Sequence, residues 1–156
     1  MQKFNPLLQW FADQTKNPGR WNHYNYSVSV SVGKAAGSTA MCSIQLDTFP
    51  YILLGLSGKI IGNTAEPATS GVYQDGQWSI EWKDSKRNFS KGYIPADLLF
   101  GNTANGFYRD LTYPVAFDGG QTITFNIRND VTRPLPGPQE TFTVALVTFG
   151  IGDFGV

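Results

Sequence analysis

The regular alternation of apolar and polar residues between positions 26 and 32 is the feature that most restricts how this chain folds. In that run three serines separate four apolar residues, namely Tyr26, Val28, Val30 and Val32. Successive side chains of a β-strand point to opposite faces of its sheet, so the pattern predicts a strand with one face buried and the other in water. Such strands are typical of antiparallel sheets, which can leave one face solvated.

Other segments carry strand patterns too. Alternation or continuous apolar character predicts strands over residues 40–46, 49–54, 77–83, 122–128 and 140–150. Glycine, proline and small polar residues predict irregular connections over residues 57–76, 89–100, 102–106 and 129–140. The tail, 150–156, is too rich in glycine for a fixed strand. Roughly seven or eight strands separated by turns predict an all-β fold, an antiparallel β-sandwich or barrel that is jelly-roll-like. We expect its core to include Val30, Ile80, Phe125 and Val144.

The first twenty residues differ from the rest of the chain. Asn5 can cap a helix whose first position is Pro6, and residues 17–19 (Asn-Pro-Gly) end it. We therefore expect an N-terminal arm with one short helix over residues 1–20, followed by a single β-sandwich domain over residues 21–156. So short a helix is not stable alone, and its apolar side chains need a surface to cover. These side chains are Leu7, Leu8, Trp10 and Phe11.

The charge balance argues against several classes of function. Twelve basic and twelve acidic side chains give zero net charge. Binding to a nucleic-acid backbone needs a strong positive excess, so no nucleic-acid partner is expected. The longest apolar stretch, 51–56, is far shorter than a membrane span, and the start of the chain has no signal-peptide pattern. We therefore expect a protein that is made in the cytoplasm and does not enter a membrane.

Residues that carry catalysis or metal binding are sparse. His23 is the one histidine, and no ligand-type residues stand beside it at metal-site spacing. The sequence shows no nucleophile elbow and no phosphate-binding loop motif, so we expect neither an enzyme nor a cofactor. Cys42 lies in an apolar run, which favours a small buried hydrophobic residue. A basic cluster favours a solvated turn over an anion- or subunit-binding patch; its members are Lys83, Lys86, Arg87 and Lys91.

Zero net charge and an apolar arm favour association with other protein subunits. A chain without net charge lacks the repulsion that keeps proteins apart. We expect a homo-oligomer, a dimer or trimer, with the arm and the aromatic residues near the ends of the domain in contact with another subunit. The candidate subunit-binding residues are Leu7, Leu8, Trp10, Phe11, Trp21 and Phe154. The alternative is that the arm folds back onto its own sandwich.

Six segments of the chain follow one another in a distinctive order. They are Phe49–Gly58, the strand with Trp78 and Ile80, Ile94–Gly101, Tyr113–Val115, Gln121–Asn129 and Phe142–Gly150. This order resembles small virion proteins of tailed bacteriophages, which are β-sandwich proteins bound on or near the capsid. The resemblance spans residues 49–150. None of its motifs has a fixed catalytic or ligand role, so it assigns no function to an individual residue.

The resemblance implies a structural protein of a tailed-phage virion, made in the host cytoplasm. Such a protein would bind the major capsid protein or other virion proteins and stabilise the shell as a decoration or cement protein. The alternative is a receptor- or carbohydrate-binding β-domain of a fibre or tail. In that role exposed aromatic residues would stack on sugar rings, and the candidates are Trp21, Tyr24, Tyr73 and Tyr108.

Overall fold

The computed structural model describes residues 21–61, 77–101, 108–135 and 137–154. Eight strands and one short helix lie in these ranges. They are β1 (Trp21–Gly33), β2 (Thr39–Gln45), β3 (Tyr51–Ile61), β4 (Trp78–Lys83), β5 (Ile94–Pro95), α3 (Ala96–Phe100), β6 (Tyr108–Phe117), β7 (Thr122–Asn129) and β8 (Thr141–Asp153). The predicted all-β fold is confirmed. The helix expected within residues 1–20 lies outside the described residues.

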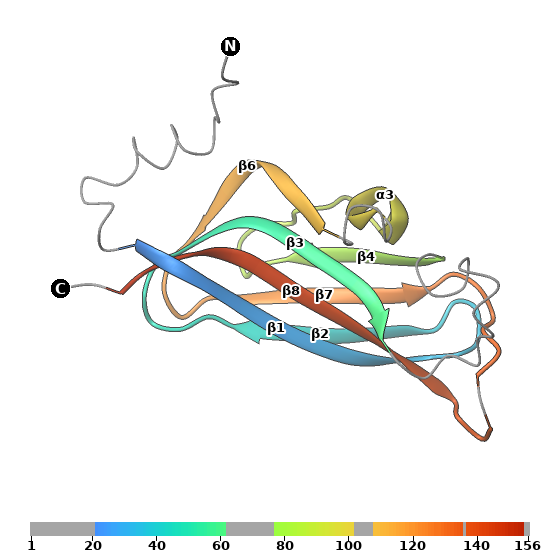
Figure 1. The fold of residues 1–156 in the computed structure, drawn as a ribbon. Helices are drawn as coiled ribbons and strands as arrows, with labels where there is room; N and C mark the ends of the chain where they lie inside the picture. The colour runs from blue at the N-terminus through green and yellow to red at the C-terminus, as the bar shows by residue number, and fades with distance from the viewer. Residues whose placement is uncertain (1–20, 62–76, 102–107, 136, 155–156) are drawn as a thin grey trace, which may run out of the picture.

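Two four-stranded antiparallel sheets face each other (Figure 1). Sheet A has the order β1-β8-β3-β6, and sheet B has the order β2-β7-β4-β5. The first strand pairs with the last, the second with the seventh, the third with the sixth and the fourth with the fifth. The chain is therefore one long hairpin rolled up so that paired strands alternate between the sheets. This is the jelly-roll arrangement, and the sandwich prediction is confirmed over the barrel.

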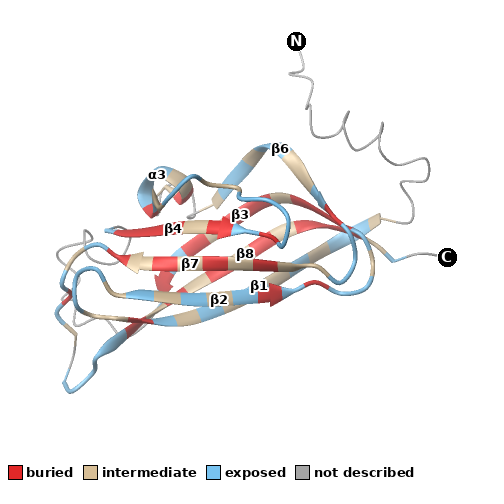
Figure 2. Cartoon of the chain, turned by 180° about the vertical axis from the view of Figure 1, so that it is seen from behind, coloured by how far each residue is buried: buried red, intermediate tan, exposed pale blue. Residues whose placement is uncertain are grey.

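The core lies between the sheets and follows the alternation of the sequence. Every second residue is buried along β7 and along β8 as far as Gly150, which gives the red bands across both strands in Figure 2. Ile80, Phe125 and Val144 are fully buried, as predicted. Val30 is half-buried instead, because β1 is the edge strand of sheet A and its inward side chains reach the rim of the sandwich.

Two strands are longer than predicted, and small residues explain both. β3 continues through Gly58 to Ile61, and β8 continues through Gly150 and Gly152 to Asp153. A Cβ at Gly58 would lie 2.7 Å from the ring of Phe100. At these positions glycine allows a ring to approach the backbone closely. The prediction that the glycine-rich tail forms no fixed strand was therefore wrong for residues 150–153.

Three elements were not predicted from the sequence: β5, α3 and β6. On β6 the charged pair Arg109 and Asp110 and the proline Pro114 interrupt any simple alternation. The strand also bulges, because residues 111–114 oppose Leu54 alone between the flanking pairs. The segment 89–100, expected to be irregular, contains β5 and the five-residue helix α3.

Candidate subunit-binding surface

Two of the six predicted subunit-binding residues lie at the same end of sheet A. Trp21 begins β1 and pairs with Asp153 at the end of β8, and Phe154 is the next residue. Figure 1 shows these strand ends together. Trp21 is half-buried, and Phe154 is 44% exposed. The other four predicted residues, Leu7, Leu8, Trp10 and Phe11, lie outside the described residues.

Phe154 belongs to a group of four rings that we call the aromatic end cluster: Tyr24, Tyr26, Phe49 and Phe154. The ring centroids of Phe49 and Phe154 are 4.5 Å apart. Tyr24 meets Tyr26, Phe49 and Phe154 edge to face at 5.0, 5.2 and 5.5 Å. These are the distances and orientations that aromatic pairs prefer. Three separate parts of the chain therefore build one apolar surface that is partly open to water.

Glycine at position 152 gives Phe49 its place in the cluster. A Cβ at Gly152 would lie 2.5 Å from the Phe49 ring, closer than real contacts allow. The ring thus covers the backbone of β8 just before Phe154. Phe49 itself lies in the connection between β2 and β3, so the cluster joins both sheets.

Asp47 fixes the tyrosines of the cluster. The phenol of Tyr26 donates a hydrogen bond to Asp47 Oδ2 at 3.1 Å and accepts one from the Asp47 backbone N–H at 3.0 Å. Burial raises the pKa of Tyr26 to about 12. Hydrogen bonding to Asp47, followed by its negative charge, raises the pKa of Tyr24. Both phenols are therefore neutral at physiological pH, which suits an apolar protein contact.

Of the four rings in the aromatic end cluster, only Phe154 was predicted from the sequence as a subunit-binding residue. Tyr24 was predicted as a sugar-stacking candidate and Tyr26 as a strand residue. Their even spacing on β1 placed both on one face, which was the available signal. No local signal pointed to Phe49, because its place depends on the pairing of β1 with β8 and on the glycine at 152.

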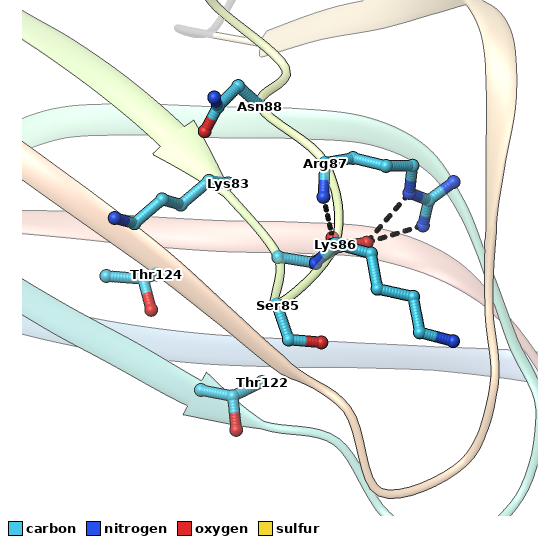
Figure 3. Close-up of a pocket in the computed structure, with 8 residues that line it drawn as sticks. Lys83, Ser85, Lys86, Arg87, Asn88, Thr122 and Thr124 are labelled. Carbon is cyan, nitrogen blue, oxygen red and sulfur yellow. Dashed lines mark hydrogen bonds and ion pairs between the residues drawn. The ribbon is translucent and has the colours of Figure 1, made fainter.

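The basic cluster borders an open depression of about 450 Å³ on the outside of sheet B. The turn at 83–88 and the strand residues Thr122 and Thr124 line it (Figure 3). In Figure 3 the side chains of Lys83 and Lys86 point away from each other. They do not converge on a single point, as an anion-binding site would require.

Arg87 is a structural member of the basic cluster. Its guanidinium pairs with the buried Asp84 at 2.6 Å and donates a hydrogen bond to the Ala116 carbonyl at 3.0 Å. It also lies 5.0 Å from the ring centroid of Phe89 and 5.1 Å from that of Phe117. Burial opposes ionisation of Asp84, but hydrogen bonds from Lys86 and Arg87 outweigh it and lower the pKa of Asp84. These contacts give Arg87 a structural role in the turn, which was predicted as a solvated turn and not as a binding patch.

The other residues singled out for chemistry have ordinary surroundings. His23 is exposed on β1, and Cys42 is half-buried on β2, where burial raises the pKa of its thiol to about 11. Across the described ranges, no three His, Cys, Asp or Glu residues lie close enough together to hold a metal ion. No helix in that part of the chain is long and apolar enough to cross a membrane.

Two of the four sugar-stacking candidates have their rings packed against the protein. Tyr24 lies in the aromatic end cluster. Tyr108 meets Phe149 edge to face at 5.1 Å and donates a hydrogen bond to Asp110 at 2.6 Å. Trp21 is half-buried, and Tyr73 lies outside the described residues.

No family model matches the chain, and no curated protein matches it. A solved structure described as "Acidic stable capsid structure of Helicobacter pylori bacteriophage KHP30" matches with a TM-score of 0.38 and 10% sequence identity. The match covers 83% of this chain and 92% of that chain. At this level of likeness it establishes no shared function.

Proposed function

We propose that this chain is a structural protein of a tailed-phage virion, which binds capsid subunits and stabilises the shell as a decoration or cement protein. The observation that carries the proposal is the aromatic end cluster. It presents partly exposed rings beside the point where the apolar arm joins the sandwich. The order of the sequence motifs, which resembles that of small virion proteins, names the class of partner.

The fold suits a rigid scaffold that binds its partners through its outer surface. Side chains from both sheets fill the space between them, including those of Trp78, Phe125 and Phe142. Two depressions of the described surface are open and border the turn after β4. We therefore propose a binding role without catalysis, in which a rigid sandwich carries contact surfaces to its neighbours.

The aromatic end cluster and the arm should contribute unequally to the free energy of binding. Phe154 exposes 44% of its surface, or about 90 Å² of the roughly 200 Å² that a large aromatic side chain can bury. Covering it contributes about 2 kcal/mol at roughly 25 cal/mol per Å². That is too little to hold a subunit alone. The apolar arm, with Trp10 and Phe11, would have to supply most of the binding, and the cluster would orient it.

The test uses shells assembled without this protein and measures its co-sedimentation with them. Deleting residues 1–18 should abolish shell binding while the thermal transition of the sandwich remains. Phe154→Ser should weaken binding by up to about 30-fold, the equivalent of about 2 kcal/mol. The matched control is Tyr113→Ser, which removes an aromatic ring that is 79% exposed on β6 and should leave binding unchanged.

Other results would contradict the proposal. If the deletion unfolds the domain and leaves no separable binding defect, the arm is part of the core. If Phe154→Ser and Tyr113→Ser bind shells equally well, the cluster is not the contact. Selective binding of the full chain to host-surface glycans, without shell binding, would favour the receptor-binding alternative.

A further inference from the structure

The two sides of the sandwich differ in how their edge strands are protected. β1 and β2 are the edges of sheets A and B on one side, and β6 and β5 are the edges on the other. An edge strand presents unpaired backbone groups that can pair with another chain. Proteins normally block such edges with charges, prolines, bulges or very short strands.

The β6 and β5 side carries all four of these devices. β6 contains Arg109, Asp110 and Pro114, and its residues 111–114 bulge out of register with β3. β5 is two residues long and ends in Pro95. Another strand cannot extend either sheet on this side without disrupting these features.

The β1 side carries none of them. β1 is 13 residues long, and its sequence contains no proline and no Asp, Glu, Lys or Arg. Its pairing with β8 is continuous, without a register shift, from Trp21 to Gly33. The adjoining edge strand β2 also lacks proline and these charged residues, and it exposes 68% of Met41. Charge depletion of this kind marks the centre of protein interfaces.

The free backbone groups of β1 can be identified from its register. Lys34 N–H donates to the Glu140 carbonyl, one step beyond the pair Gly33 and Thr141. Hydrogen-bonding direction alternates along an antiparallel strand. The even-numbered residues of β1 therefore bond to β8, and odd-numbered residues direct their N–H and C=O groups to the open edge. This parity places the backbone N–H and C=O groups of Ser27, Ser29 and Ser31 at the open edge.

We infer that the open edge of β1 pairs antiparallel with β1 of a second copy of this chain, across a two-fold axis near Ser29. The strand is complementary to itself under that operation, because small neutral serines meet each other and no like charges do. A two-fold contact is also closed, so it ends at the dimer and does not propagate into fibres. The two copies of sheet A would become one continuous eight-stranded sheet.

The surface area that the contact buries indicates how stable the dimer should be. A two-fold axis at Ser29 pairs residues 25–33 of the two copies, a stretch about 31 Å long at roughly 3.4 Å per residue. An edge about 10 Å wide then buries on the order of 300 Å² per copy, less than half of a standard interface of roughly 800 Å². We expect a dimer that dissociates on dilution. This inference deepens the proposed role in the virion, but its test uses the isolated chain and is independent of shell binding.

The experiment is sedimentation equilibrium of the full chain over a wide concentration range. The wild-type chain should fit a monomer–dimer equilibrium. Ser29→Lys places two like charges opposite each other in the dimer and should weaken dimerisation by about tenfold or more, because the substitution occurs twice. Ser29→Pro removes an outward N–H, which an edge strand tolerates, and should act similarly. The matched control is Thr112→Lys on the protected β6 edge, which should dimerise like wild type.

Circular dichroism checks that each variant keeps its sheets. If Ser29→Pro unfolds the domain, the test of the β1 dimer rests on Ser29→Lys. The chain without residues 1–18 should still dimerise. A wild-type chain that stays monomeric throughout, or Ser29→Lys dimers as stable as wild type, would overturn the inference. Loss of dimerisation on removal of residues 1–18 would overturn it too, because the arm would then be the interface.

Discussion

The side chain of Tyr26 holds Asp47 by both its carboxylate and its backbone. The phenol donates to Asp47 Oδ2 and accepts from the Asp47 N–H, at 3.1 and 3.0 Å. Tyr26 belongs to sheet A, whereas Asp47 lies two residues beyond Gln45, the last residue of β2 in sheet B. The two bonds therefore fasten the sheets to each other at the end that carries the aromatic end cluster.

Replacing Tyr26 with phenylalanine removes both of these hydrogen bonds while leaving the ring in place. Each bond contributes about 0.5–1.5 kcal/mol, so Tyr26→Phe should lower the free energy of unfolding by about 1–3 kcal/mol. Urea denaturation measures the change. Tyr113→Phe, on an exposed ring, is the control. A Tyr26→Phe variant as stable as wild type would mean that the connection between the sheets does not depend on Asp47.

Alkaline pH should destabilise the protein through its tyrosines. Burial raises the pKa of Tyr26, Tyr51 and Tyr108 to about 12, from an ordinary value of 10.0. The folded state then binds these protons more tightly than the unfolded state does. Their stabilisation is complete below pH 10 and is lost as the pH rises from 10 to 12. Urea midpoints should fall over that interval, and Tyr51→Phe should reduce the slope. Urea midpoints that stay constant between pH 10 and 12 would contradict the raised pKa values of these tyrosines.

The glycines of β8 should differ in how they tolerate a methyl group. A Cβ at Gly150 would lie 2.3 Å from the carbonyl oxygen of Ile52, which is backbone and cannot turn away. A Cβ at Gly152 would meet the ring of Phe49, which can swing out. Overpacking costs about 1–3 kcal/mol, so Gly150→Ala should reach the upper part of that range and Gly152→Ala the lower part. Thermal denaturation of the two variants compares them directly, and the reverse order would show that Phe49 is the more rigid neighbour.

The buried ring of Phe125 should be among the most sensitive core positions. It is fully buried on β7 and stacks on Trp82 at 6.2 Å. Phe125→Ala should cost about 3–5 kcal/mol through lost burial and the cavity it leaves. Phe125→Leu keeps most of the volume and should cost clearly less. A near-neutral alanine variant in chemical denaturation would show that the site collapses around the missing ring.

Period-two alternation predicted most of the sheet structure because it records which face of each strand meets the core. It succeeded on Ile80, Phe125 and Val144, which lie on strands in the body of the sheets. It overestimated the burial of Val30, because nothing in the local pattern shows that β1 is an edge. The strand β6 escaped detection, since the charges and proline that protect its edge also hide its alternation.

The surface at the end of sheet A was only partly predictable. Trp21 and Phe154 stood out as large apolar residues near the ends of the domain. That they lie at the same end of sheet A follows from the pairing of the first strand with the last, which is a property of the whole topology. In the sequence, the glycines at 150 and 152 predicted that the tail forms no fixed strand, whereas in the structure β8 continues through both of them to Asp153.

The pairing of Trp21 with Asp153 also has a practical consequence for engineering. Because the first and last described strands end together, a short linker from residue 154 to residue 21 would let the chain be circularly permuted. New termini could be opened at Gly37, whose surroundings within 4 Å of an added Cβ are empty. Conversely, peptide cargo fused ahead of Trp21 and cargo fused after Phe154 would both emerge from one pole of the sandwich. Two such fusions on one chain would crowd each other there and leave the opposite pole unmodified.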